Sequence, residues 1–196
     1  MDIDHARAMM SYAEGNTPMY PQHLIGRHVR LETLKSDADI EVMKKWTEHS
    51  TSWRMLDTVN VRSPLAKNVE PHHMNRPTQF FFRLYPLNAE RPIGHAGLFG
   101  IQWAAGEAWL GIGLGSREYW AKQYGSDAIQ VILSYGFTEL DLRRVMIGVF
   151  DYDARAILSY EEAGFVIEGR MLQEAGRAGR SRAGVRMGLQ REAWAG

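Results

Sequence analysis

A short turn before a predicted amphipathic helix brings together residues suited to holding an anion. Within residues 117–137, Lys122, Gly125, Ser126 and Asp127 come before the apolar residues of the helix. The first amides of a helix lack partners within it and carry a partial positive charge, which favours an anion. Small residues such as Gly125 and Ser126 let a phosphate approach these amides, and Lys122 adds a point charge. The alternative is that Ser126 or Asp127 caps an ordinary helix, and these residue types alone favour that alternative.

Two further polar clusters have ordinary explanations. Glu70, His72 and His73 lie in the segment EPHHMN, and their spacing matches no helical zinc signature. We therefore expect a polar loop and no metal, with a substrate-side role for a histidine left open. Arginines crowd the segment GRAGRSRAGVR, which is typical of a solvated hairpin loop. An acidic substrate or RNA is the alternative, although the neutral chain as a whole does not favour a nucleic-acid partner.

Composition limits the function classes. The chain has 196 residues, 45% of them hydrophobic and 23% charged, and its formal net charge is zero. It has no cysteine, which excludes disulfides, thiolate metal sites and a cysteine nucleophile. No apolar run approaches the roughly 20 residues that cross a bilayer, and the acidic first residues do not resemble a secretory signal. We expect a soluble, cytoplasmic protein.

Periodicity and turn signals predict an alternation of strands and helices. Strands are predicted at 27–34, 78–85, 91–103, 107–116, 143–150, 165–171 and 182–190, and helices at 2–14, 35–49, within 117–137 and at 153–164. Residues 50–76 are predicted to be irregular or to form short helices. A helix connects the strands at 107–116 and 143–150, so these strands should be parallel neighbours in a mixed sheet. We interpret 1–22 as a helical appendage and 23–196 as a single domain.

Several segments together resemble a known family. The segment YWAKQYGSDA resembles the YWGKGYGTEA type of sequence in the acetyl-CoA-dependent N-acetyltransferases of the GNAT superfamily, in particular the branch that acts on ribosomal protein N-termini. The segments VRLETL, AWLGIGLGSREYW, RRVMIGVFDYDARAILSYEEAGFVIEG and RMGLQREAW are similar to other parts of that family, in the same order. The resemblance covers most of residues 27–194.

This resemblance implies a fold and a cofactor. The fold would be α+β, with a mostly antiparallel mixed sheet of about seven strands, splayed central strands and helices on both faces. Acetyl-CoA would be the acyl donor, with its pantetheine arm in the gap between the splayed strands and its diphosphate on the helix amides. The cofactor-binding residues would be Ile112, Gly113, Leu114, Lys122, Gln123, Tyr124, Gly125, Ser126, Asp153 and Tyr160.

The resemblance also implies the reaction, which is direct attack of a primary amine on the thioester in a ternary complex. The amine would belong to a small molecule or a protein N-terminus. Apart from the resemblance, the extra N-terminal helix and the paired final strands are elements that commonly form subunit contacts, so a homodimer is one candidate assembly. Tyr160 matches the family's general acid, and packing on the sheet is its alternative role. Glu107 is the base that we select, with Glu118, His95 or a water relay as alternatives. Acceptor-binding residues would be Trp53, Arg54, Asp57 and His95.

Three positions depart from the family pattern. Gln123 replaces a glycine and would be strained by about 1 kcal/mol or more if its φ is positive. Asp153 stands where an asparagine is usual, and we expect it to cap the following helix. Trp109 stands where relatives often carry a glutamate. These departures motivate a second hypothesis, a non-catalytic acyl-CoA-binding or scaffold protein that retains the fold.

Overall fold

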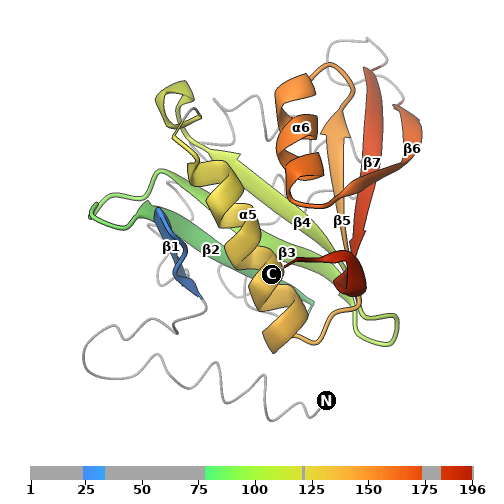
Figure 1. Cartoon of the computed structure of the whole chain (residues 1–196), viewed down its shortest axis with the longest axis horizontal. Helices are drawn as coiled ribbons and strands as arrows, with labels where there is room; N and C mark the ends of the chain where they lie inside the picture. Colours follow the sequence, from blue (N-terminus) through green and yellow to red (C-terminus); the bar gives the residue numbers. More distant parts are fainter. Residues whose placement is uncertain (1–23, 34–77, 121, 174–181, 196) are drawn as a thin grey trace.

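The computed structural model describes residues 24–33, 78–120, 122–173 and 182–195 (Figure 1). The expected helices at 2–14 and 35–49, the segment 50–76 and the appendage 1–22 lie outside these residues. The loop at 174–181 lies outside them as well. No helix within the described ranges is long and apolar enough to cross a membrane.

The described strands form a single seven-stranded mixed sheet (Figure 1). The order across the sheet is β1-β2-β3-β4-β5-β7-β6, with antiparallel pairing everywhere except between β4 and β5. This arrangement confirms the predicted α+β fold. The strands are β1 (Val29–Thr33), β2 (Gln79–Pro86), β3 (Gly94–Gln102), β4 (Glu107–Leu114), β5 (Arg144–Phe150), β6 (Val166–Gln173) and β7 (Arg182–Gln190).

The two central strands separate after a short paired stretch. The parallel register between β4 and β5 runs from Glu107 opposite Arg144 to Trp109 opposite Met146, and it stops there. Beyond Trp109, β4 stays paired with β3 while β5 stays paired with β7 along its whole length. The main-chain groups on the β5 side of residues 110–114 are therefore free of strand pairing. The predicted splay of the central strands is confirmed.

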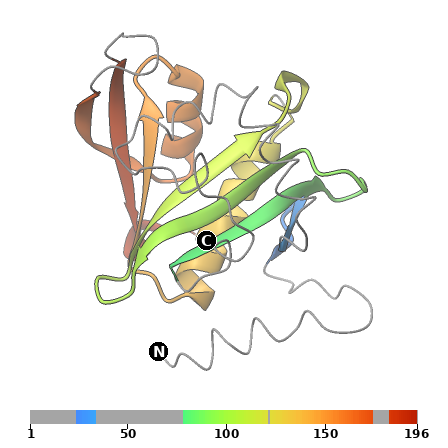
Figure 2. The ribbon, with the colours of Figure 1, turned by 180° about the vertical axis from the view of Figure 1, so that it is seen from behind.

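Both described helices cover the same face of the sheet. Helix α5 (Tyr124–Ser134) continues into the π-helical turn η5 (Tyr135–Glu139), and helix α6 (Ala154–Glu162) follows β5. Figure 1 shows both helices in front of the strands, and Figure 2 shows them behind. Helices were expected on both faces of the sheet, and the predicted helices at 2–14 and 35–49 lie outside the described ranges.

Alternation along the strands builds the core beneath these helices. Ala108 and Leu110 of β4 are buried with Ile129, Ile132 and Leu133 of α5 in one hydrophobic cluster. Burying a leucine or isoleucine side chain stabilises the fold by about 1.5–3 kcal/mol. This packing holds the N-terminus of α5 at the end of β4, where the two central strands have already separated.

Residues on the opposite face of the sheet are also buried. Phe81 of β2 stacks on Phe99 of β3 with ring centroids 6.2 Å apart, and both side chains are almost fully buried. Burial on both faces explains the continuous apolar run FFF in β2, which does not alternate as a half-exposed strand would. On the same face, the buried carboxylate of Glu32 contacts Arg30 at 3.1 Å and Arg83 at 3.5 Å.

Candidate active site

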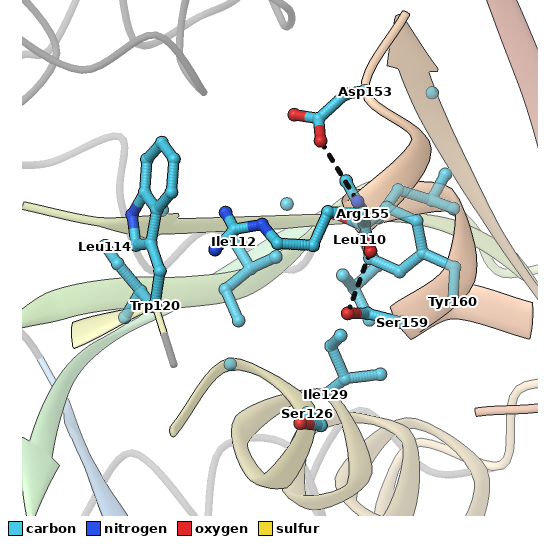
Figure 3. A pocket seen from close by; sticks show the side chains of 16 residues that line it. Leu110, Ile112, Leu114, Trp120, Ser126, Ile129, Asp153, Arg155, Ser159 and Tyr160 are labelled. Carbon is cyan, nitrogen blue, oxygen red and sulfur yellow. Dashed lines mark hydrogen bonds between the residues drawn. The ribbon is translucent and has the colours of Figure 1, made fainter. Parts of the chain in front are cut away.

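A pocket opens between the separated strands and the two helices (Figure 3). Its floor is the part of β4 that is not paired with β5, residues 110–114, and its walls come from the start of α5, from β5 and from α6. The residues that line it are Leu110, Gly111, Ile112, Gly113, Leu114, Trp120, Gly125, Ser126, Ile129, Ile147, Gly148, Asp153, Arg155, Ala156, Ser159 and Tyr160. The structure thus brings together three strand residues expected to hold pantetheine with Gly125, Ser126, Asp153 and Tyr160.

The turn before α5 has a left-handed residue at its N-cap. Gln123 has φ 60° and ψ 3°, and its side chain makes no capping bond. The φ of this position is therefore positive, which is the condition under which we expected the replacement of glycine by Gln123 to cause strain. Lys122 and Gln123 are exposed on the turn and do not line the pocket, while Tyr124 packs at the edge of the core.

Gly125 leaves space toward the pocket, and its backbone conformation is one that any residue can adopt. Its φ is not positive, and a Cβ placed on it would meet Leu114 Cδ1 at an ordinary 3.8 Å as its nearest neighbour. The surrounding protein therefore leaves room for a side chain that the glycine does not have. Gly125 lines the pocket in the first turn of α5, where the free helix amides favour an anion.

Asp127 does not cap its own helix, so the alternative in which it does so is wrong. Its carboxylate accepts hydrogen bonds from the main-chain N–H groups of Arg27 at 3.0 Å, His28 at 2.7 Å and Val29 at 3.0 Å. Ser126 is not a cap either, and its hydroxyl donates only a long 3.5 Å bond to the carbonyl of Gln123. Because these hydrogen bonds hold the Asp127 carboxylate against residues 27–29, it does not occupy the main-chain amides at the start of α5.

Asp153 is the N-cap of α6, as expected. Its Oδ1 accepts a hydrogen bond from the N–H of Ala156 at 3.0 Å. The same residue lines the pocket, so it places a carboxylate beside the space assigned to the cofactor.

Tyr160 lies on the inner side of α6 and reaches the pocket (Figure 3). The residue is 9% exposed, and its ring meets Phe165 edge-on at 6.0 Å between ring centroids. Burial, and secondly the charge of Asp153, raise the pKa of the phenol above its ordinary value of 10.0. Tyr160 therefore keeps its proton at neutral pH and has one to donate.

The structure does not bring Glu107 to the pocket. Its carboxylate pairs with Arg144 at 3.0 Å, at the closed end of the β4–β5 pair. Arg144 also contacts Glu168 at 2.6 Å, and that carboxylate contacts Arg186 at 3.4 Å. Glu107 thus belongs to a network of ion pairs and is not placed to receive a proton from an amine in the pocket.

The other described residues that were expected to act as a base or to bind the acceptor do not line the pocket either. Glu118 is exposed in the turn η4 (Arg117–Tyr119). His95 is buried in β3 opposite Gly113, where loss of solvation lowers the pKa of its imidazole to about 3. Trp109 lies opposite Phe99 and Met146 in the paired part of the sheet. Trp53, Arg54 and Asp57 lie outside the described residues.

Sequence reasoning missed two residues at the pocket mouth. The guanidinium carbon of Arg155 lies 4.0 Å from the centroid of the Trp120 indole, and both residues line the pocket (Figure 3). Arg155 was visible as a cation two residues after the helix cap, and Trp120 as an aromatic residue before the turn. Nothing in their spacing, 35 positions apart, indicated that they meet.

No group of three or more histidine, cysteine, aspartate or glutamate side chains suited to a metal ion occurs within the described ranges. The polar side chains that line the pocket are the carboxylate of Asp153, the guanidinium of Arg155, the phenol of Tyr160 and the hydroxyls of Ser126 and Ser159. This set suits an anionic ligand that carries an acyl group, because it combines anion-binding groups with a proton donor.

Comparison with known proteins identifies the family to which this chain belongs. The family model for the acetyltransferase (GNAT) domain matches residues 28–166, well over half of the chain. The chain therefore belongs to the GNAT acetyltransferase family. One curated relative, an uncharacterized N-acetyltransferase p20 from Bacillus licheniformis, is 36% identical over 64 residues. The matched segment spans 33% of this chain and only about a third, 35%, of that relative.

Solved structures share the fold at low identity. A spermidine N-acetyltransferase from Vibrio cholerae, solved with CoA and spermine, has a TM-score of 0.72 at 22% identity over 85% of this chain and 97% of its own. A dodecameric spermidine N-acetyltransferase from the same organism has a TM-score of 0.67 at 22% identity, over 84% of this chain and 95% of its own. A probable acetyltransferase has a TM-score of 0.68 at 18% identity, over 86% and 96% of the two chains. These likenesses concern the fold alone.

Proposed function

We propose that this chain transfers an acetyl group from acetyl-CoA to a primary amine, by direct attack in a ternary complex. The observation that carries the proposal is the position of Tyr160, a buried phenol that retains its proton in a pocket leading to the N-terminus of α5. Membership in the GNAT family supports the same reaction. Direct attack also suits a chain that has no cysteine to form an acyl-enzyme.

The residues present fit acetyl-CoA at two points. The unpaired edge of β4 at residues 110–114 offers main-chain groups to the amides of a pantetheine arm. The space over Gly125 and the amides of residues 122–126 suits a diphosphate. Acetyl-CoA, when bound, supplies the acetyl group as a reactive thioester. The chain's part is to position it and to stabilise the charges that develop.

The roles of the side chains follow from proton balance. When the amine nitrogen forms its bond to the acyl carbon, the carbon–sulfur bond breaks and the leaving sulfur needs a proton, which Tyr160 supplies. A main-chain N–H on the open edge of β4 near Ile112 or Gly113 stabilises the oxyanion. The amine must also lose a proton. Because neither Glu107 nor His95 lines the pocket, we assign that step to water rather than to a single side chain.

Three classes of amine are candidates for the acceptor, and one experiment distinguishes them. A protein N-terminus is one class, as in the branch that the sequence resembles. A polyamine is another, because the Vibrio cholerae enzyme was solved with spermine. Other small primary amines form a third class. Among the described strand residues, Glu32, Glu107 and Glu168 each pair with arginine, so these carboxylates do not offer free charge to a polycation. We also propose a homodimer as the assembly to test by light scattering.

The test follows free thiol released from acetyl-CoA with peptides, spermidine and small primary amines as separate acceptors. We expect amine-dependent thiol release with one class, and a rise in Tm with CoA alone because a ligand of the folded state stabilises it. No thiol release with any class, together with no thermal shift, would contradict the proposal.

A second function, acyl-CoA binding without catalysis, is favoured by the left-handed Gln123 and by Asp153 at the pocket. It requires the thermal shift by CoA and the absence of amine-dependent thiol release. The same two measurements therefore distinguish the two functions.

A further inference from the structure

Arg155 and Trp120 meet across the mouth of the pocket. Trp120 belongs to the connection between β4 and α5, whereas Arg155 lies in the first turn of α6. Figure 3 shows the arginine side chain extending from α6 toward the indole, over the space between the two helices. The contact, at 4.0 Å from guanidinium carbon to ring centroid, joins the two walls that the separated strands hold apart.

Within the described ranges, Arg155 makes no ion pair, unlike Arg144 and Arg191. Arg144 contacts Glu107 and Glu168, and Arg191 contacts Asp141 at 2.6 Å. Asp153 is the nearest acid in sequence, but its Oδ1 accepts from the main chain of α6. The Arg155 side chain is exposed at the mouth of the pocket, so its charge is available to a ligand.

The partner that Arg155 now has is a weak one. Arg155 is exposed, and a cation–π contact at an exposed site gains little, because water competes for the cation. Charge-assisted bonds from a guanidinium fork to phosphate oxygens are stronger and are often bidentate. An anion that entered the mouth would therefore draw the guanidinium away from the indole.

Position determines which anion this would be. The amides at the start of α5 lie on the opposite wall of the same pocket, beside Gly125 and Ser126. A ligand whose phosphates rest on those amides would have Arg155 facing it from α6. We propose that Arg155 binds a phosphate group of coenzyme A, and that its contact with the indole of Trp120 positions the guanidinium before the ligand binds. This rests on the proposed function, because it assumes that coenzyme A occupies the pocket.

The test compares Arg155→Gln with Arg170→Gln, a matched control. Arg170 is an exposed arginine of the edge strand β6 that does not line the pocket. Calorimetric titration with CoA should give a Kd about tenfold higher for Arg155→Gln, and an unchanged Kd for the control. Pantetheine, which has no phosphate, should raise the Tm of both variants and of the wild type equally. An unchanged CoA affinity in Arg155→Gln, or an equal loss with pantetheine, would overturn the proposal.

Dephospho-CoA identifies which phosphate is held. If Arg155→Gln weakens dephospho-CoA as much as CoA, the guanidinium holds the diphosphate. If the loss disappears, it holds the 3′-phosphate. Either result supports the proposal, provided that CoA itself binds about tenfold more weakly.

Trp120→Leu tests whether Arg155 or Trp120 contacts the phosphate. Removing the indole should leave the CoA affinity within about twofold of wild type, because the guanidinium and not the ring contacts phosphate. A loss as large as that of Arg155→Gln would make the indole the ligand and would overturn the proposal. Absence of CoA binding by the wild type would instead remove the proposed function. Binding by the wild type with no effect of Arg155→Gln would remove this inference alone.

Discussion

The carboxylate of Asp127 fills the space beside Gly26. A Cβ placed on Gly26 would lie 2.5–2.7 Å from the carboxylate atoms, while the same carboxylate accepts three main-chain N–H groups from residues 27–29. The relationship ties the first turn of α5 to the entry into β1, about 100 residues earlier in the chain. The hydrogen bonds from residues 27–29 to Asp127 thus fix the first turn of α5, which follows the turn that we assign to a diphosphate.

Asp127→Ala should therefore destabilise the protein by about 2–3 kcal/mol, because it leaves three amides without their acceptor. Asp127→Asn keeps an acceptor oxygen without the charge and should lose less. Gly26→Ala should destabilise as well, since its Cβ would displace the carboxylate. Urea unfolding curves measure all three variants. Stability equal to wild type in Asp127→Ala would show that these bonds hold nothing in place.

Gln123→Gly should stabilise the protein by about 1 kcal/mol, because glycine adopts the left-handed conformation without a steric penalty. Gln123→Ala is the control, since it removes the side chain but retains the strain, and it should bring no gain. Thermal unfolding with a fixed heat-capacity change gives both values. A gain of equal size in the alanine variant would mean that the side chain, and not the backbone angle, is unfavourable.

Asp153→Asn should leave stability unchanged, because asparagine caps a helix about as well as aspartate does. The same change removes a negative charge from the pocket lining and should lower the Kd for CoA. Asp153→Ala should lose about 1 kcal/mol of stability through the missing cap. Calorimetry and urea unfolding provide the two readouts, and a CoA affinity weaker in Asp153→Asn than in wild type would contradict this account.

Tyr160→Phe should lower kcat by about 10²–10⁴-fold while the Kd for CoA stays near that of wild type. The pKa of the phenol is raised, so Tyr160 keeps its proton up to and beyond pH 10, and no alkaline decline in rate below that pH should come from it. Steady-state thiol release between pH 6 and 9.5 measures both effects. Full activity in Tyr160→Phe would remove the general acid from the mechanism.

Stability should fall in weak acid because of His95. Burial lowers the pKa of His95 from 6.5 to about 3, so the unfolded chain binds a proton that the folded chain does not bind between these values. Acidification therefore favours unfolding, and ΔG of unfolding should drop by about 1 kcal/mol from pH 7.5 to pH 5.5 through this group. His95→Gln should remove that part of the slope, even if it is less stable at pH 7.5. Parallel slopes in the two proteins would show that His95 does not titrate on unfolding.

Local patterns in the sequence were enough to predict the described strands and the two described helices. A mostly apolar run placed β5 at 143–150, against Arg144–Phe150 in the structure, and Gly164 ended α6 as predicted, with φ 98°. The splayed strands and the role of the turn at 122–126 came from the family resemblance, because no single-segment pattern encodes a gap between neighbours.

Contacts between distant segments could not be predicted. Asp127 looked like a helix cap, but its partners lie at residues 27–29, and only the packed structure shows them. Glu107 looked like a base at the start of a central strand, yet the parallel register places Arg144 opposite it. Pairings of this kind depend on strand register and on crossover geometry. Neither can be read from residue types and their spacing in the sequence.

A crystal structure with CoA tests the central claim most directly. We predict the diphosphate within hydrogen-bonding distance of main-chain amides in residues 122–126, the pantetheine arm along β4 at residues 110–114, and the sulfur near the Tyr160 hydroxyl. A pocket left empty at saturating CoA, or CoA bound elsewhere with Gln123 folded across the turn, would contradict the account.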